Sequence, residues 1–263
     1  MTSLVGRRDE LSAIDRWFAS GARLLTIAGP PGVGKSRLVR ELAAQHAGTV
    51  VCDLTTCRSA ADVERSVQGA LGGVSRARLA RVIATLDRPI VLDRFEHLVE
   101  SARDLVASWT SGAGPHIVIA SREPLGLAGE STIVLGPLDE ADAIALYAAR
   151  AKREVDLPAV AAIVRKLDRL PLAIELAAAR ASVLSDRDLL QRLERGIDAI
   201  DSRASRLRAT ILWSLDLLTA PERATLVRCA VFRGAFDGRA AETVARSDDA
   251  PSDTIGDLVA LER

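Results

Sequence analysis

Eight residues between a short apolar run and a helical pattern constrain this chain more than any other feature. The segment Gly29-Pro30-Pro31-Gly32-Val33-Gly34-Lys35-Ser36 fits the pattern G-x-x-x-x-G-K-[ST] of a phosphate-binding loop, or P-loop. The apolar run Leu24–Ala28 before it predicts a buried strand, and the apolar spacing after it predicts a helix that ends near Gly48. In such a strand–loop–helix unit, successive backbone amides can curl around a phosphate at the positive end of the helix.

The lysine in this pattern makes a chance match improbable. The chain has 18 Gly but only three Lys, because nearly all of its basic residues are Arg. With such a composition, a random match is expected roughly once in five hundred chains of this length. Lys35 would reach the β- and γ-phosphates and the Ser36 hydroxyl would ligate Mg²⁺. The sequence therefore predicts binding of a nucleoside diphosphate or triphosphate.

The residues up to about 136 read as alternating strands and helices. Further strands are predicted over 49–54, 89–93, 116–120 and 132–135, and helices over 60–71, 75–86 and 96–109. Most of these strands are unbroken apolar runs, which is typical of a parallel sheet covered on both faces. Ligands of such sheets bind beyond the carboxyl ends of the strands, where Ser36, Asp93 and Arg122 would all lie.

Three of these positions suggest chemistry. Asp93 closes the third predicted strand and is the expected Walker-B carboxylate, so Ser36 and Asp93 form the predicted Mg²⁺ site. Many enzymes of this kind place an acid directly after that Asp, but here the position is Arg94. Glu96 is the nearest carboxylate; it either activates the attacking water or only supplies favourable charge at a helix start. Arg122 either touches the γ-phosphate or is a solvated surface residue. These residues predict slow turnover.

From about residue 137 the pattern changes to successive helices. Helices are predicted over 140–151, 157–168, 172–184 and 186–195, the last with a capping box at Ser185–Asp188. A further block follows, with helices near 206–217, before residue 229, over 238–246 and over 254–262. We therefore expect a nucleotide-binding domain over 1–136, a helical domain over 137–201 and a third domain over 202–263.

Composition excludes several other classes of protein. The formal net charge is zero, which gives no overall attraction to nucleic acid or to an anionic membrane surface. The three Cys match no zinc pattern and are expected to be buried thiols in a reducing compartment. Charged residues at the N-terminus and the lack of a long apolar run predict a cytoplasmic protein without a membrane span.

Six segments, taken in order, resemble the STAND class of signal-transducing ATPases, and in particular the NB-ARC-like modules of large bacterial transcriptional regulators. The segments are Leu4–Arg7 with Glu10, the P-loop, Ile90–Leu98, Ile117–Glu130, Leu167–Arg180 and Leu207–Phe236. The resemblance implies a three-layer P-loop domain with a five-stranded parallel sheet, an all-α helical domain and a winged-helix domain, which we expect to be incomplete in this chain.

The resemblance also implies roles for individual residues. Val5, Gly6 and Arg7 would contact the adenine and ribose, Pro171 would pack on the adenine, and Arg122 matches the sensor arginine of the family. The expected nucleotide-binding residues are then Val5, Gly6, Arg7, Gly29, Pro31, Gly32, Val33, Gly34, Lys35, Ser36, Arg37 and Pro171, and the expected catalytic residues are Lys35, Asp93, Glu96 and Arg122.

Two positions depart from the pattern of the family. Arg94 stands where Asn or Asp is common, which affects the hydrolytic step. Arg169 stands where Gly is common, so either the turn before Pro171 differs or Arg169 adopts a strained conformation.

These features predict an adenine-nucleotide-dependent switch. It would be a closed, ADP-bound monomer at rest and an open, ATP-bound form that oligomerises or releases an effector domain absent from this chain. An AAA-type engine, a DNA-binding regulator and an NTPase specific for another base remain alternatives. Residues 203–263 carry nine Arg and nine Asp plus Glu, a balance that argues against direct DNA binding by the winged-helix block.

Overall fold

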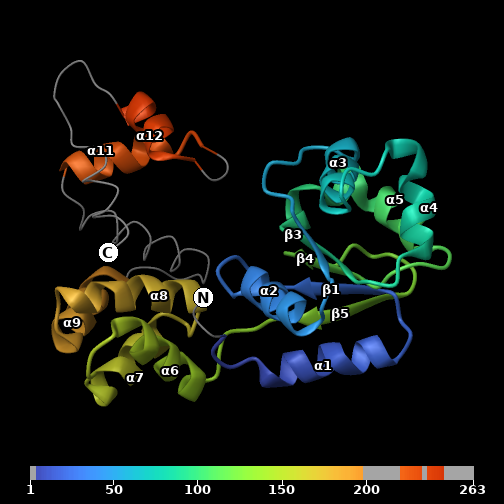
Figure 1. Ribbon diagram of the computed structural model, residues 1–263. Helices are drawn as coiled ribbons and strands as arrows, with labels where there is room; N and C mark the ends of the chain where they lie inside the picture. Colours follow the sequence, from blue (N-terminus) through green and yellow to red (C-terminus); the bar gives the residue numbers. More distant parts are fainter. Residues whose placement is uncertain (1–3, 198–219, 233–235, 246–263) are drawn as a thin grey trace. The chain divides into compact units, whose positions relative to one another are not determined.

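The computed structural model describes residues 4–197, 220–232 and 236–245 (Figure 1). The chain divides into two compact units, Met1–Leu138 and Asp139–Arg263. Within the described ranges, no helix combines the length and the apolar character that crossing a bilayer requires.

The first unit is a parallel five-stranded sheet between two layers of helices. Its elements are α1 (Arg8–Ala19), β1 (Leu24–Ala28), α2 (Lys35–Gln45), β2 (Val50–Asp53), α3 (Ala60–Ala70), α4 (Arg76–Thr85), β3 (Ile90–Asp93), the 3₁₀ turn η1 (Phe95–His97), α5 (Val99–Thr110), β4 (Ile117–Ser121) and β5 (Glu130–Val134). The strand order is β2-β3-β4-β1-β5, and every pairing is parallel. The predicted five-stranded parallel sheet is confirmed.

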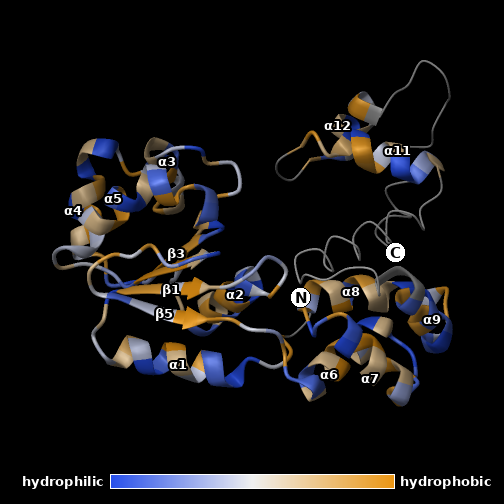
Figure 2. Ribbon diagram, turned by 180° about the vertical axis from the view of Figure 1, so that it is seen from behind, coloured by the Kyte–Doolittle hydropathy of each residue, from blue (hydrophilic) through white to orange (hydrophobic). Residues whose placement is uncertain are grey.

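Two hydrophobic cores cover the sheet. One face packs α1 and α2 through residues such as Ile14, Leu38 and Leu42. The other packs α3, α4 and α5 (Figure 1) through residues such as Val67 and Ile83. Figure 2 shows β1 and β3 as hydrophobic strands, whereas α1 alternates hydrophilic and hydrophobic residues, as expected of a helix with one face in water.

The edge strand β2 differs from the unbroken apolar run expected of a buried strand. Its residues alternate between buried and exposed, with Val51 exposed, since β2 has a neighbour on one side only. The helix predicted over 96–109 is also interrupted. It begins as η1, and α5 starts only at Val99.

The second unit opens with four helices. They are α6 (Glu140–Ala151), α7 (Leu157–Lys166), α8 (Pro171–Ala179), followed by the 3₁₀ turn η2 (Arg180–Ser182), and α9 (Asp186–Ile197). Ser185 caps α9 as predicted, because its Oγ accepts a hydrogen bond from the backbone N–H of Asp188 at 3.2 Å. Asp186 joins the elements: its buried carboxylate accepts hydrogen bonds from Tyr147 and Arg153.

The helix predicted over 172–184 is too long. α8 ends at Ala179, and beyond it the Nε of Arg153 donates to the Ala181 carbonyl at 2.8 Å. This bond, which comes from 28 residues away in the sequence, takes a carbonyl that a continued α-helix would have used.

Arg169 has a φ of +55° and Asp168 a φ of +53°, so the turn before Pro171 places two consecutive residues in the left-handed region. The strained conformation that was one of two expectations for Arg169 is therefore confirmed. Two further helices, α11 (Ala220–Cys229) and α12 (Gly238–Ala245), contact each other. The helices predicted over 206–217 and 254–262 lie outside the described residues.

Candidate functional site

The phosphate-binding loop joins β1 to α2. Gly32 and Gly34 have φ values of +78° and +100°, which other residues rarely adopt, and these conformations let the loop curl back on itself. Gly29 is needed for a different reason. A Cβ atom at Gly29 would lie 2.8 Å from the Leu135 carbonyl oxygen, so no larger residue fits there without displacing backbone. The Gly29 amide itself donates to the Arg122 carbonyl at 3.2 Å.

Lys35 is the first residue of α2 and is 9% exposed. Its Nζ donates to the carbonyls of Gly29 and Pro30 at 2.7 and 3.1 Å, so the ammonium lies against the loop itself. Burial lowers the pKa of Lys35; the charge of Arg122 acts in the same direction, while Glu96 and Asp93 oppose it. Arg122, Glu96 and Asp93 therefore all lie close enough to Lys35 to affect its charge.

Ser36 and Asp93 come together as expected of a Mg²⁺ site. The Ser36 hydroxyl donates to Oδ1 of Asp93 at 2.8 Å, and Asp93 is 2% exposed at the end of β3. Burial raises the pKa of Asp93, and the bond from Ser36 only partly offsets it.

A hydroxyl beside one carboxylate fits Mg²⁺, which is held by few protein oxygens and completes its shell with phosphate and water. Among the described residues, no group of three or more His, Cys, Asp or Glu could hold a metal ion.

Arg94, directly after Asp93, turns away toward β2. Its φ is +64°, and its Nη1 donates to Oγ1 of Thr55 at 2.9 Å. Thr55 in turn donates through its backbone N–H and its hydroxyl to Oδ1 of Asp53, the strand neighbour of Asp93. Burial acts to raise the pKa of Asp53, but the bonds from Thr55 and the charge of Arg94 lower it overall. Asp53 and Thr55 were not singled out in the sequence, where they read as the ordinary end of a strand.

Glu96 and Arg122 line a hollow of about 400 Å³ beside the ends of β3 and β4. Ser121 also lines it, at 1% exposed. Within the described part of the chain, Oγ of Ser121 and Oε2 of Glu96 are buried and make no hydrogen bond. Unpaired buried oxygens cost free energy unless a ligand or water satisfies them. Sequence reasoning missed Ser121, because a serine that closes an apolar strand is a common strand end.

Arg7 has more partners than the sequence suggested. Its guanidinium donates to Oε1 of Glu10 at 2.7 Å, to the Val33 carbonyl at 3.1 Å and to the Gly136 carbonyl at 2.6 Å. Gly6 and Arg7 both have left-handed backbone conformations just before α1. The predicted contacts of Val5, Gly6 and Arg7 with adenine and ribose stay predictions. Pro171 begins α8 in the second unit, and its role likewise stays a prediction.

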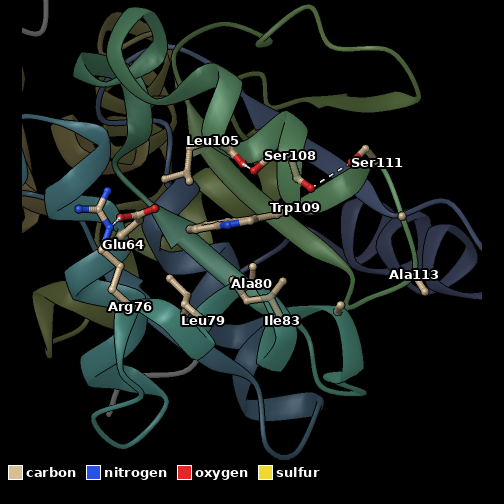
Figure 3. A pocket seen from close by; sticks show the side chains of 12 residues that line it. Glu64, Arg76, Leu79, Ala80, Ile83, Leu105, Ser108, Trp109, Ser111 and Ala113 are labelled. Atoms are coloured by element: carbon tan, nitrogen blue, oxygen red, sulfur yellow. Dashed lines mark hydrogen bonds and ion pairs between the residues drawn. The ribbon is translucent and has the colours of Figure 1, made fainter.

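A second hollow, of about 380 Å³, lies between α4 and α5. In Figure 3 the Trp109 ring lies between Leu105 and Ile83, and the ion pair of Arg76 with Glu64 stands at one end. Its rim at Ser111–Ala113 leads into the start of β4. The parallel strands begin at this end of the sheet, and the phosphate-binding loop lies at the other end, where they finish. It therefore belongs to a different surface from the site described above.

The three cysteines show no sign of catalytic use. Cys52, Cys57 and Cys229 are buried and unpaired, as predicted. Burial raises the pKa of the Cys52 thiol to about 11, which keeps it protonated and unreactive near neutral pH.

Comparison with known proteins gives matches in sequence and in fold. A family model described as an AAA ATPase domain matches residues 3–123. An uncharacterized protein of Mycobacterium tuberculosis is 38% identical over 278 residues, covering 95% of this chain and 70% of that protein. Another protein of the same organism, whose name describes an HTH-type transcriptional regulator, is 34% identical over 266 residues, covering 91% of this chain and 30% of that protein.

Among solved structures, the chain is similar to a Signal Transduction ATPase with Numerous Domains (STAND) protein with a tetratricopeptide repeat sensor, from Pyrococcus horikoshii. The TM-score is 0.65 at 15% sequence identity, and the match covers 98% of this chain and 39% of that one. At this identity the likeness is one of fold. The chain spans about two fifths of the length of that protein.

Proposed function

We propose that the chain, which carries an AAA-type ATPase domain and resembles a STAND protein in fold, is an adenine-nucleotide-dependent signalling switch. With ADP bound it is a closed monomer at rest. With ATP bound it opens and oligomerises, or releases an effector that lies outside this chain. Residues 1–136 bind the nucleotide, residues 137–201 form a helical domain that closes on the base, and residues 202–263 contribute a winged-helix domain.

One observation carries the nucleotide site: the Ser36 hydroxyl lies 2.8 Å from the Asp93 carboxylate, directly after a glycine loop whose backbone is curled for phosphate. A hydroxyl–carboxylate pair at this point is what a Mg²⁺-bound di- or triphosphate requires. Mg²⁺, when bound, neutralises charge on the β- and γ-phosphates. The buried Lys35 ammonium exchanges its two loop carbonyls for phosphate oxygens, and the start of α2 adds the positive end of its dipole.

Base recognition in this proposal falls to residues outside the phosphate-binding loop. Val5, Gly6 and Arg7 lie on the N-terminal segment that leads to the loop, and Pro171 begins α8. We assign Val5, Gly6 and Pro171 to the adenine and ribose, with Arg37 at the phosphate end and Arg7 in the same nucleotide site. A chain purified with bound nucleotide should therefore carry ADP rather than GDP, and nucleotide extraction followed by chromatography measures this directly.

Hydrolysis in this proposal takes place beside the hollow that Glu96, Ser121 and Arg122 line. The two unpaired oxygens, Oε2 of Glu96 and Oγ of Ser121, suit a water molecule, which Glu96 would deprotonate as it attacks the γ-phosphate. Arg122 would stabilise the γ-phosphate charge and report its presence. Arg94, held by Thr55, supplies no acid at the usual position, which supports slow turnover.

A switch needs the two nucleotides to prefer different domain arrangements. Moving a population from 1:99 to 99:1 takes about a 10⁴-fold difference in affinity between the two states. The γ-phosphate can supply part of this through Arg122, and Pro171 can supply part through the base.

The test of the site is a lysine substitution. Lys35→Ala should leave the purified chain without nucleotide and weaken Mg²⁺–ADP binding by roughly 100-fold or more, because the phosphates lose a buried cation. Lys152→Ala removes an exposed lysine at the end of α6 and serves as the matched control. If Lys35→Ala retains nucleotide as well as Lys152→Ala does, the proposed site is wrong.

An AAA-type engine is the main alternative. It predicts rapid multiple turnover and a ring in the presence of ATP, whereas the switch predicts tight ADP retention and slow turnover. The relative named as an HTH-type transcriptional regulator favours a place for such a module inside a longer regulator. Duplex binding by this chain alone, measured at several salt concentrations, would support a DNA-binding regulator instead.

A further inference from the structure

A single buried guanidinium holds the phosphate-binding loop to the segment that leaves the sheet. Arg7 is 7% exposed and its Nη2 donates to two backbone carbonyls, Val33 at 3.1 Å and Gly136 at 2.6 Å. Val33 stands in the loop two residues before Lys35. Gly136 follows the end of β5 and precedes Leu138, the last residue of the first unit. The residues joined are 26 and 129 positions from Arg7 in the sequence.

A second set of contacts joins the same two segments. The Leu135 amide donates to the Ala28 carbonyl at 2.8 Å, just before the loop begins. The Leu135 carbonyl oxygen stands 2.8 Å from where a Cβ of Gly29 would lie, so the first residue of the loop is closely packed against Leu135. Residues 135–136 therefore contact the loop at its start and, through Arg7, at its middle. Three residues after Gly136, Asp139 caps α6, the first helix of the second unit.

The chemistry of the Arg7 site favours a fixed link. The planar guanidinium donates in three directions, and the Glu10 carboxylate at 2.7 Å balances its charge. Without the guanidinium, two carbonyls and one carboxylate would lose their partners in a mostly buried place. A lysine ammonium offers no planar fork to bridge both carbonyls in this way.

We propose that Arg7 is a positioning residue that fixes the phosphate-binding loop to the connector 135–138, so that occupation of the loop by phosphate stabilises the connector. The proposal rests on the nucleotide site proposed above. It gives Arg7 a function different from contact with adenine or ribose. The nucleotide signal then leaves the P-loop domain through the Gly136 backbone, because the connector continues directly into α6.

Pyrophosphate separates the two functions, since it fills the loop but has no base or sugar. If Arg7 holds the loop, Arg7→Gln should weaken Mg²⁺–ADP and Mg²⁺–pyrophosphate equally, by roughly 10- to 100-fold. If Arg7 instead contacts the base or ribose, ADP alone should weaken. Titration calorimetry on the full chain measures both. Arg7→Lys, which keeps the charge beside Glu10, should give a smaller loss with both ligands and replaces Arg7→Gln if that variant does not fold.

Hydrogen exchange tests the link itself. In the unsubstituted chain, saturating pyrophosphate should slow amide exchange in peptides covering both 28–36 and 133–138. In Arg7→Gln at saturation, the first peptide should still be protected but the second should not. Arg23→Gln is the matched control. Arg23 donates to two carbonyls, Trp109 and Pro115, from the residue before β1 at the opposite end of the strand, so it should leave both peptides unchanged.

Three results would overturn the proposal: loss of ADP affinity alone, unchanged protection of 133–138 in Arg7→Gln, or equal effects of Arg7→Gln and Arg23→Gln. A chain that binds neither ligand would refute the proposed function. The link between the loop and the connector would then be tested by hydrogen exchange of the two peptides in the ligand-free chain. Faster exchange of both peptides in Arg7→Gln, but not in Arg23→Gln, would support the link, and unchanged exchange in Arg7→Gln would refute the link.

Discussion

Replacing Arg169 by glycine should stabilise the protein, although most substitutions destabilise. Arg169 has a φ of +55° in the turn between α7 and α8, with its amide donating to the Val164 carbonyl at 2.9 Å. Among the described residues, its guanidinium makes no hydrogen bond or ion pair. The side chain therefore contributes strain without a compensating contact.

The magnitude follows from two opposing effects. A left-handed conformation costs a non-glycine residue about 1–2 kcal/mol. Glycine removes this cost but loses about 0.4–1 kcal/mol through the greater freedom of the unfolded chain. The net gain for Arg169→Gly is then about 0.5–1 kcal/mol, which corresponds to roughly 1–4 °C in the melting temperature of a chain of this size.

Urea unfolding followed by circular dichroism measures the change, with an unchanged m-value required for its interpretation. Arg165→Gly is the control, since Arg165 is an exposed arginine of the last turn of α7. Glycine there interrupts a helix and should destabilise by about 1 kcal/mol. The two arginine-to-glycine changes, four positions apart, should have opposite signs. A lower urea midpoint for Arg169→Gly would refute the strain argument.

Three further predictions concern the charged residues. Burial raises the pKa of Asp93, so its carboxylate costs stability; the cost grows as the pH rises from the ordinary aspartate pKa to the raised one and is complete above it. Asp93→Asn should therefore stabilise the nucleotide-free protein at pH 7 by on the order of 1 kcal/mol, lose this advantage in acid melts below the ordinary aspartate pKa, and weaken Mg²⁺–nucleotide binding in calorimetry. Arg94→Asn, which suits the φ of +64°, should leave the melting temperature within about 2 °C of its original value, because the relieved strain offsets the lost bond to Thr55. Asp186→Ala should destabilise by about 3–5 kcal/mol in urea, because Arg153 loses its buried partner.

The sheet and the approach of Ser36 to Asp93 could be predicted from the sequence because each depends on local pattern. The glycine loop, the apolar strands and Asp93 at a strand end occupy fixed positions relative to one another, and parallel topology then brings Ser36 and Asp93 together. The end of α8 could not be predicted in this way. It depends on Arg153, whose bond to the Ala181 carbonyl arises only after the helices pack.

The site residues that the sequence analysis did not identify also depend on tertiary contacts and not on local pattern. Ser121 stands out because its buried hydroxyl has no hydrogen-bond partner among the described residues and lies in the same hollow as Glu96, which no local sequence pattern indicates. Likewise, Asp53 and Thr55 come close to Arg94 only because β2 pairs with β3, and the sequence alone does not indicate this contact. Composition and periodicity report which faces are buried, whereas the satisfaction of individual polar atoms is decided by tertiary contacts.

Three of the non-glycine residues in left-handed conformations are arginines in segments that carry the family resemblance: Arg7, Arg94 and Arg169. Strain of this kind persists where surrounding contacts over-determine it. Arg7 is held by two carbonyls and Glu10, and Arg94 is held by Thr55, so in both cases the guanidinium gains what the backbone loses. Arg169 has no such contact among the described residues. Its backbone conformation must then be required by the turn alone, which leads Pro171 into α8, and a glycine there would keep the turn without the strain. The same reasoning predicts that glycine at Arg7 would destabilise, since the lost hydrogen bonds outweigh the relieved strain.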